Sequence, residues 1–286
     1  MEKIQSALAK ARAERNAKGP VPAKPAPDAP VVRTPAATPQ RTEALSGSTE
    51  AWQALPKLAF KPKLMKKHRI VALDGGREAA GIDMMRTRVL QQMRANGWRR
   101  LAITSPTAEC GKSTVAVNLA MSLQRQSDLK TILMELDLRR PALTKILGVE
   151  GEMSFAHVLD GTQDFADNAL RYGPNLAVSA NHRAWRDAAE LLGGANIPEI
   201  LSDIEAAYAP DVMLFDMPPM LINDDVMAFV RHVDCVLLVA GAETTSIKQI
   251  DICEQDLASQ TNVMGVVLNK CRYMGPDYDY GAYAYA

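Results

Sequence analysis

Short apolar runs that alternate with helical stretches are the feature that most constrains the fold of this chain. From about residue 69 onward, runs rich in Val, Ile and Leu lie at 101–104, 131–136, 175–179, 212–216, 235–240 and 263–269. Helical patterns separate them, for example at 112–125, 197–208 and 246–258. Continuous apolar strands joined by helical crossovers predict an α/β fold with a mostly parallel sheet covered on both faces. Ligands of such sheets bind at the carboxyl ends of the strands.

A candidate phosphate-binding loop follows the first of these runs. The stretch SPTAECGKST, at 105–114, joins the run to a helix and ends in the motif Gly-Lys-Ser-Thr. A phosphate here would meet the free N–H groups of a helix N-terminus. Lys112 is predicted to reach the β- and γ-phosphates, and Ser113 to offer its hydroxyl to Mg²⁺. The motif and its context predict a three-layer P-loop NTPase, although Pro106 stands where such loops usually have their first glycine.

Three carboxylates follow later apolar runs. Glu135 and Asp137 lie at the end of the second run, and Asp216 ends the run at 212–216. A carboxylate just past a buried strand is costly unless it meets a cation or water, and beside a phosphate loop the natural cation is Mg²⁺. Asp137 and Asp216 also begin turns, where Asp is common for local reasons. We favour the metal interpretation because three such carboxylates occur together; the expected ligand positions are Ser113, Asp137 and Asp216, with Glu135 close to the metal.

The remaining parts of the chain have a different composition. The pattern of residues 1–18 predicts a short basic amphipathic helix. This helix is either a solvated end of the chain or a docking helix for a partner or an anionic surface. Residues 19–68 predict a disordered linker, rich in Pro and Ala and ending in a basic run. The folded domain is expected at 69–272 and a tyrosine-rich tail at 273–286.

Composition narrows the classes of protein. The 286 residues are 47% hydrophobic, which supports a sizeable core, and the formal net charge of zero argues against a general attraction to nucleic acid. The four cysteines are scattered, which disfavours a zinc site or a disulfide framework. The chain has no apolar run long enough to span a membrane, so we expect a cytoplasmic protein.

Several motifs together resemble the bacterial tyrosine kinases of exopolysaccharide and capsule synthesis. They are TSPTAECGKST, LMELDLRRPALTKILG, VMLFDMPPML and GVVLNK, with AELLGG at 189–194, and the resemblance covers roughly residues 69–286. It implies binding of ATP and Mg²⁺, with catalytic roles for Lys112, Glu135, Asp137 and Asp216. Asp216 would hold the metal through water, and Asp137 would help the acceptor hydroxyl lose its proton. The implied nucleotide-binding residues are Ala108, Glu109, Cys110, Gly111, Lys112, Ser113, Thr114 and Asn269, the last of them at adenine.

The C-terminal tail contains five of the seven tyrosines of the chain. Aromatic side chains in a segment that cannot bury them need a reason other than packing, although a sticky tail is an alternative. The resemblance implies that they are autophosphorylation sites, namely Tyr273, Tyr278, Tyr280, Tyr283 and Tyr285.

The family pattern is not complete. Glu109 replaces a usual glycine and is expected to need a positive φ, while Glu135 replaces a usual Asp. The ring-forming Glu-x-x-Arg-x-x-Arg helix of the family corresponds here to Ala80, Asp83 and Arg86, of which only the last matches. Cys110 is expected to act as a small apolar residue rather than as a redox handle.

Two alternatives therefore stay open beside a tyrosine autokinase. One is a partitioning-type ATPase, whose loop would carry a lysine where this chain has Thr107. The other is a nucleotide-binding regulator of polysaccharide export with a weakened site. For the kinase, the resemblance implies a membrane adaptor or polysaccharide co-polymerase as partner, self-association through the kinase domain and no nucleic acid. The protein would then lie at the inner face of the plasma membrane by recruitment.

Overall fold

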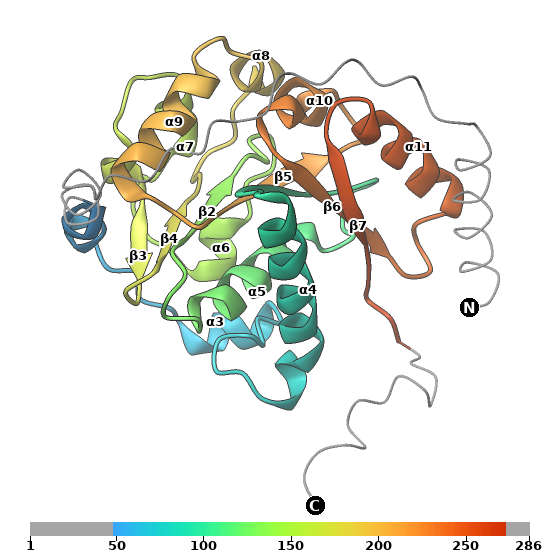
Figure 1. Ribbon diagram of the computed structural model, residues 1–286, viewed down its shortest axis with the longest axis horizontal. Helices are drawn as coiled ribbons and strands as arrows, with labels where there is room; N and C mark the ends of the chain where they lie inside the picture. The colour runs from blue at the N-terminus through green and yellow to red at the C-terminus, as the bar shows by residue number, and fades with distance from the viewer. Residues whose placement is uncertain (1–47, 273–286) are drawn as a thin grey trace, which may run out of the picture. The chain divides into compact units, whose positions relative to one another are not determined.

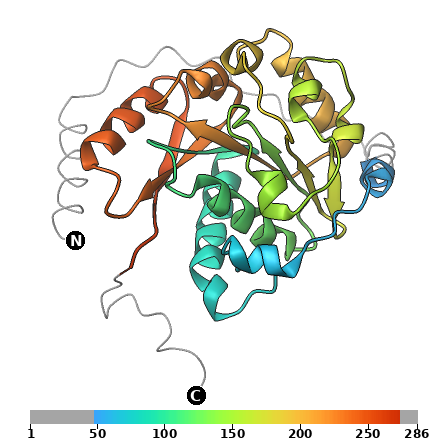
Figure 2. The ribbon, with the colours of Figure 1, turned by 180° about the vertical axis from the view of Figure 1, so that it is seen from behind.

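A seven-stranded sheet forms the centre of the molecule in the computed structural model, which describes residues 48–272 (Figures 1 and 2). The strand order is β3-β4-β2-β5-β1-β6-β7. Every neighbouring pair is parallel except β3 and β4. The strands are β1 Arg100–Ser105, β2 Thr131–Glu135, β3 Leu170–Tyr172, β4 Leu176–Ser179, β5 Val212–Pro219, β6 Cys235–Gly241 and β7 Asn262–Asn269. The predicted mostly parallel α/β sheet is confirmed.

Two layers of helices cover the sheet, and each encloses its own apolar core. On one face lie α3 (Pro62–Lys67), α4 (Ala80–Asn96), α5 (Lys112–Gln124) and α6 (Leu143–Leu147). On the other lie α7 (Phe155–Leu159), α8 (Ala188–Leu192), α9 (Ile197–Tyr208), α10 (Asp225–Phe229) and α11 (Ile247–Ala258). Along β1, Leu101 and Ile103 enter the first core and Ala102 the second, because successive side chains of a strand point to opposite faces.

Three short 3₁₀ helices complete the described elements: η1 Arg77–Ala79, η2 Phe165–Asn168 and η3 Val230–His232. The sequence did not predict η2 or the edge strand β3. Both are too short to show a period, and the residues of β3 are only partly buried. Among the described residues, no helix is both long enough and apolar enough to cross a bilayer.

The expected linker at 19–68 is corrected over residues 48–68. Residues 48–54 are helical, α3 follows, and the side chains of Trp52, Leu55, Leu58 and Met65 are all buried. The Trp52 indole N–H donates to the Tyr208 carbonyl at 2.7 Å. Four apolar side chains in a proline-containing stretch form no regular period, so only tertiary contacts show that they belong to the core. The predicted helix at 1–18, the linker up to 47 and the tail at 273–286 lie outside the described residues.

Candidate nucleotide-binding site

The loop between β1 and α5 has a backbone that requires glycine at its last position. Gly111 has a φ of 93°, and a Cβ atom there would lie 2.2 Å from Asn269 Nδ2. Glu109 also has a positive φ, of 65°, and is exposed. The expected strained backbone at Glu109 is therefore confirmed, and its carboxylate lies at the surface, where water screens its charge beside a phosphate site.

Contacts from the ends of two other strands hold this loop in place. At the β5 side, the Leu221 N–H donates to the Pro106 carbonyl at 3.0 Å. At the β7 side, Asn269 Nδ2 donates to the Cys110 carbonyl at 2.9 Å. Proline keeps its carbonyl acceptor while lacking an N–H, so Pro106 makes the contact that the loop needs without the glycine usual at that position.

Lys112 is the first residue of α5 and points at two carboxylates. Its Nζ lies 2.7 Å from Asp137 Oδ2, 4.0 Å from Asp216 Oδ1 and 3.3 Å from Ser113 Oγ. Burial by itself lowers the pKa of Lys112, but Asp216 and Asp137 outweigh that effect and the pKa is raised. The lysine is therefore a buried cation at the N-terminus of a helix, where anionic phosphates also bind.

Asp216 is the most exceptional group at this site. Its side chain is fully buried in β5, and no described group donates a well-formed hydrogen bond to either carboxylate oxygen; the Ser113 hydroxyl and the Lys112 amine are the polar groups beside it. Burial raises the pKa of Asp216 to about 6, although Lys112 acts in the opposite direction. A buried carboxylate without hydrogen bonds is costly, and a bound cation would offset that cost.

Asp137 completes a cluster of side-chain oxygens beside Lys112 that could act as metal ligands. It lies two residues beyond β2, and its Oδ1 accepts from the Arg140 N–H at 3.2 Å while Oδ2 contacts Lys112. The carboxylates of Asp137 and Asp216 with the Ser113 hydroxyl form the hard oxygen set that Mg²⁺ prefers. The residues present therefore fit a magnesium ion, and the structure brings together the three ligand positions expected from the sequence.

Glu135 is held by backbone N–H groups, while its carboxylate still acts electrostatically on Lys112 and Asp216. Its Oε1 accepts from the N–H groups of Ala142 (2.5 Å) and Leu143 (2.8 Å), and its Oε2 accepts from that of Asn181 (2.8 Å). Within residues 48–272 no three acidic, His or Cys side chains group as metal ligands, so the expected trio of carboxylates does not form. Glutamate is one methylene longer than aspartate, and here that length carries the carboxylate to the start of α6.

The other predicted loop residues have local structural roles. Cys110 is buried, with its Sγ 3.5 Å from the hydroxyls of Thr107 and Thr245. Burial raises the pKa of the Cys110 thiol, but the hydrogen bonds from both threonines outweigh it and the pKa is lowered. The carbonyls of Ala108 and Thr114 accept bonds from within the loop and α5. A contact of Asn269 with adenine stays a prediction.

Three residues that stabilise the site were missed. Arg139 forms a bidentate pair with Asp225, a buried carboxylate on α10, at 2.8 and 3.0 Å. This pair links the segment after β2 to helix α10. Asn118 in α5 bonds the backbone at Val71 and Ala72 and so fixes the entry to the domain. The Asp-x-Arg spacing could have indicated Arg139, but no local pattern indicates Asp225 or Asn118.

The sequence of this chain is similar to those of known P-loop NTPases and tyrosine-protein kinases. The family model for ParA, described as NUBPL iron-transfer P-loop NTPase, matches residues 98–285. The tyrosine-protein kinase ptk of Acinetobacter johnsonii is 26% identical over 154 residues, which are 53% of this chain and 20% of that protein. The tyrosine-protein kinase etk of Escherichia coli K12 is 28% identical over 171 residues, which are 59% of this chain and 23% of that protein.

A solved structure matches more of the chain than these sequences do. The kinase domain of the Escherichia coli tyrosine kinase ETK superposes with a TM-score of 0.64 at 26% identity, covering 74% of this chain and 84% of that domain. The chain thus corresponds to about a quarter or less of the full-length curated relatives, and to most of a separate kinase domain. It belongs to the ParA family of P-loop NTPases, and in sequence and fold it is similar to the kinase domains of bacterial tyrosine kinases.

Proposed function

We propose that this protein is an ATP-dependent tyrosine autokinase that regulates exopolysaccharide synthesis or export. The observation that carries the proposal is the buried Asp216 carboxylate, without a hydrogen bond from the described residues, beside Lys112 at the start of α5. The kinase names of the relatives in sequence and fold support the choice of reaction.

The reaction would be in-line transfer of the γ-phosphoryl group of ATP to a tyrosine oxygen. Catalysis of this kind depends on positioning and charge stabilisation more than on covalent chemistry. Lys112 would leave Asp137 and bind the phosphates. Ser113, Asp137 and Asp216 would hold Mg²⁺, which supplies positive charge to the phosphate oxygens when bound.

Asp137 is the residue that we assign to the acceptor proton. An ordinary tyrosine hydroxyl has a pKa of about 10, so the phenol needs a nearby base. Once Lys112 has moved to the phosphates, Asp137 Oδ2 loses its present partner and faces the site. Glu135 does not take this role, because three backbone N–H groups already bind its carboxylate.

The acceptors would be the five tail tyrosines, which lie outside the described residues. We also propose a membrane adaptor as partner and self-association of the kinase domain. A ring built through α4 as in the family pattern is not part of the proposal. Asp83 and Arg86 instead contact Ser122 and Arg125 of the same chain.

The test is phosphotyrosine mapping by mass spectrometry on the full chain isolated from its source cells, where any partner is present. Wild type is compared with Lys112→Met and with Lys130→Met, a control lysine whose amine contacts the Trp52 ring away from the loop. We expect phosphate on Tyr278–Tyr285 in wild type and in the control, and none in Lys112→Met. Full modification of Lys112→Met would contradict the site assignment.

One observation favours a second candidate, the nucleotide-binding regulator. Glu135 stands where the family has an aspartate, and backbone N–H groups at the start of α6 bind its carboxylate. ATP binding by the wild type with no phosphotyrosine in source cells would select this regulator. The partitioning-type ATPase has less support, because Thr107 contacts Cys110 within the loop at the position where that class carries a lysine.

A further inference from the structure

The basic run at the end of the expected linker forms part of the surface of the folded domain. Residues 57–69 contain six Lys or Arg and no Asp or Glu. The run is fixed to the domain because Leu58 and Met65 are buried in it. α3 also packs closely on the end of α6, since a Cβ atom at Gly148 would lie 2.7 Å from Leu64 Cδ1. The fold therefore sets the position of these charges, which a linker would not do.

Three lysines of α3 lie on the same side of the helix. Lys63, Lys66 and Lys67 have the spacing i, i+3 and i+4, and all three are exposed. None of their amines forms an ion pair within the described domain, whereas the neighbouring Lys61 pairs with Glu150. Like charges at this spacing destabilise a helix. An anionic surface that lies across the three lysines would offset that cost.

A pair of half-buried aromatic rings borders these lysines. Phe60 directly precedes the N-cap residue of α3, and its ring packs on that of Tyr172 in the edge strand β3, with centroids 4.4 Å apart. The Leu58 N–H donates to the Arg171 carbonyl at 2.8 Å, so the basic run lies along this strand. Partly exposed aromatic rings beside lysines are typical of surfaces that contact the interfacial layer of a bilayer.

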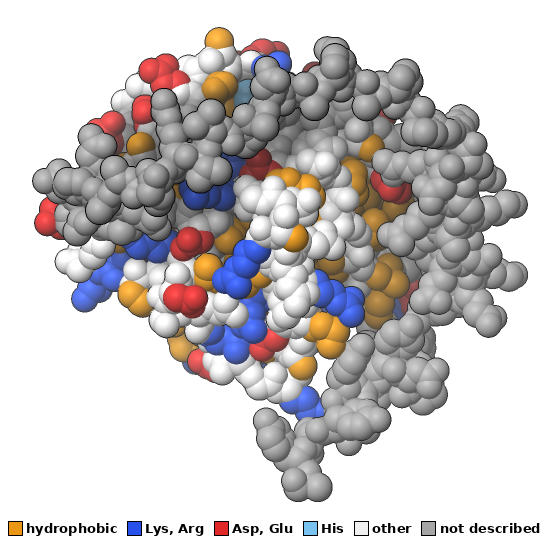
Figure 3. Space-filling view, viewed as in Figure 1, with side chains coloured by type: hydrophobic (Ala, Val, Ile, Leu, Met, Phe, Trp, Pro, Cys, Tyr) orange, Lys and Arg blue, Asp and Glu red, His pale blue; other side chains and the backbone are white. Residues whose placement is uncertain are grey.

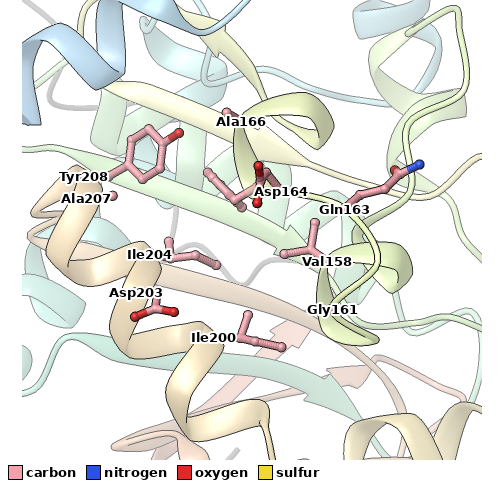
Figure 4. Close-up of a pocket in the computed structure, with 11 residues that line it drawn as sticks. Val158, Gly161, Gln163, Asp164, Ala166, Ile200, Asp203, Ile204, Ala207 and Tyr208 are labelled. Atoms are coloured by element: carbon pink, nitrogen blue, oxygen red, sulfur yellow. The ribbon is translucent and has the colours of Figure 1, made fainter.

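The helical layer on the other face of the sheet carries charge of the opposite sign. Asp164 and Asp203 line a cavity of about 410 Å³ between α9 and the segment that joins α7 to η2 (Figure 4). Residues 160–168 and 197–208 contain six acidic residues and no Lys or Arg, although the formal net charge of the chain is zero. Figure 3 shows acidic side chains over α9, and Lys and Arg side chains mostly below the middle of the view. A flat anionic surface would therefore attract the side of α3 and repel that of α9.

We propose that one face of the domain, termed the α3 face, binds an anionic lipid surface. Its residues are Lys57, Phe60, Lys63, Lys66, Lys67 and Tyr172. The lysine amines would reach the lipid phosphates, while their alkyl stems and the two rings would lie along the interface. The contact would turn α9 and its acidic residues away from the lipid.

The chemistry of the α3 face suits lipid better than nucleic acid. The two aromatic rings pack on each other, so they offer less open ring surface on which a base could stack. Only one of the six basic residues at 57–69 is an arginine, the residue whose planar guanidinium best binds a single phosphate with two hydrogen bonds. Lysines on one side of a helix instead present point charges to an extended anionic plane.

The experiment measures co-sedimentation of the full chain with lipid vesicles in the absence of nucleotide. Vesicles of phosphatidylcholine alone are compared with vesicles of equal parts phosphatidylcholine and phosphatidylglycerol, at low and at high salt. A triple variant removes the charge of α3 by the changes Lys63→Gln, Lys66→Gln and Lys67→Gln. The matched control removes three exposed basic side chains of the other helical layer, by the changes Arg186→Gln, Arg231→Gln and Lys248→Gln. Thermal unfolding checks that both variants are folded.

We expect the wild type and the control to bind the anionic vesicles equally and to be released at high salt. Each lysine near an anionic surface should contribute about fivefold to the affinity, so the triple variant should bind about a hundredfold more weakly. Vesicles of phosphatidylcholine alone should bind all three proteins poorly.

A second measurement uses the wild type alone. Labelling of lysine amines, read by mass spectrometry, shows which side chains the vesicles cover. Anionic vesicles should protect Lys63, Lys66 and Lys67 from the reagent and leave Lys248 on α11 reactive. If the triple variant does not fold, this protection pattern decides the matter.

Four outcomes would overturn the proposal. One is binding that the triple variant leaves unchanged, which would place the lipid contact elsewhere in the chain. Another is an equal loss in the control, which would show general charge attraction. The third is equal binding to both kinds of vesicle, or no binding to either. The fourth is tighter binding of a DNA duplex that the triple variant abolishes, which would assign the α3 face to nucleic acid.

Discussion

Glu135 and Asp216 are paired in register on the neighbouring strands β2 and β5, and both carboxylates are fully buried. Their surroundings differ sharply. Glu135 accepts three backbone hydrogen bonds, while Asp216 accepts none from the described residues. A carboxylate whose oxygens are satisfied by the backbone is a structural group, whereas one whose nearest charged neighbour is a lysine at 4.0 Å is available to a cation. This contrast is why we assign the metal role to Asp216 and not to Glu135.

The first prediction at the residue scale concerns Asp216→Asn. Because burial raises the pKa of Asp216 even against the effect of Lys112, removal of its charge should raise the free energy of unfolding of the nucleotide-free protein by about 1–3 kcal/mol at neutral pH. The rise in Tm that Mg²⁺ with ATP produces in the wild type should disappear. Thermal unfolding with and without Mg-ATP measures both effects. A destabilised variant that keeps the full Mg-ATP response would contradict the metal assignment.

The second prediction concerns pH. Burial raises the pKa of Glu135 to about 7, against the backbone N–H groups that lower it, and the unfolded chain has its ordinary lower value. The folded state therefore holds the proton more tightly than the unfolded state, and stability falls as pH rises through this window. Between pH 5.5 and 8, we expect a loss of about 1–3 kcal/mol from this group. Urea unfolding measures the slope, which Glu135→Gln should reduce without abolishing it, because Asp216, whose pKa is raised to about 6, contributes in the same direction. A slope that Glu135→Gln leaves unchanged would refute the role of Glu135.

At the scale of elements, the segment at 48–68 is part of the domain rather than a tether. Trp52→Ala should cost about 3–5 kcal/mol of unfolding free energy, because the ring is buried and its N–H bonds the Tyr208 carbonyl. Gln53→Ala, at an exposed neighbour, should cost less than about 0.5 kcal/mol. Denaturant unfolding compares the two. Equal small effects would mean that this segment behaves as a linker after all.

Most elements of the sheet and its crossovers could be predicted because their patterns are local. The strands predicted at 101–104, 212–216 and 235–240 are found, and the helix predicted at 197–208 is α9. The end of β5 was placed too early, since the strand continues through Pro218 to Pro219. Proline favours extended backbone but lacks an N–H, so the sequence indicated a turn where the carbonyl of Pro218 in fact accepts from the Thr104 hydroxyl.

At the scale of the whole molecule, nucleotide binding and phosphoacceptance should separate. A variant with all five tail tyrosines changed to Phe should bind ATP as the wild type does, because none of them belongs to the described site. It should lose its phosphotyrosine. Equilibrium ATP binding and phosphotyrosine mapping on the same sample measure the two properties. Phosphate retained elsewhere in the chain would move the acceptors away from the tail.

The sequence by itself determined the fold class and the position of the phosphate loop, because hydrophobic period and the Gly-Lys-Ser-Thr motif depend only on near neighbours in the chain. It also indicated Asp137 and Asp216. Only the tertiary structure decided that Glu135 is held at α6, that Trp52 belongs to the core and that Asp225 secures Arg139. Each of these features depends on contacts between residues from different elements of the fold. The length of one side chain, or one partner far away in the sequence, decides which contact forms, and no local sequence pattern predicts it.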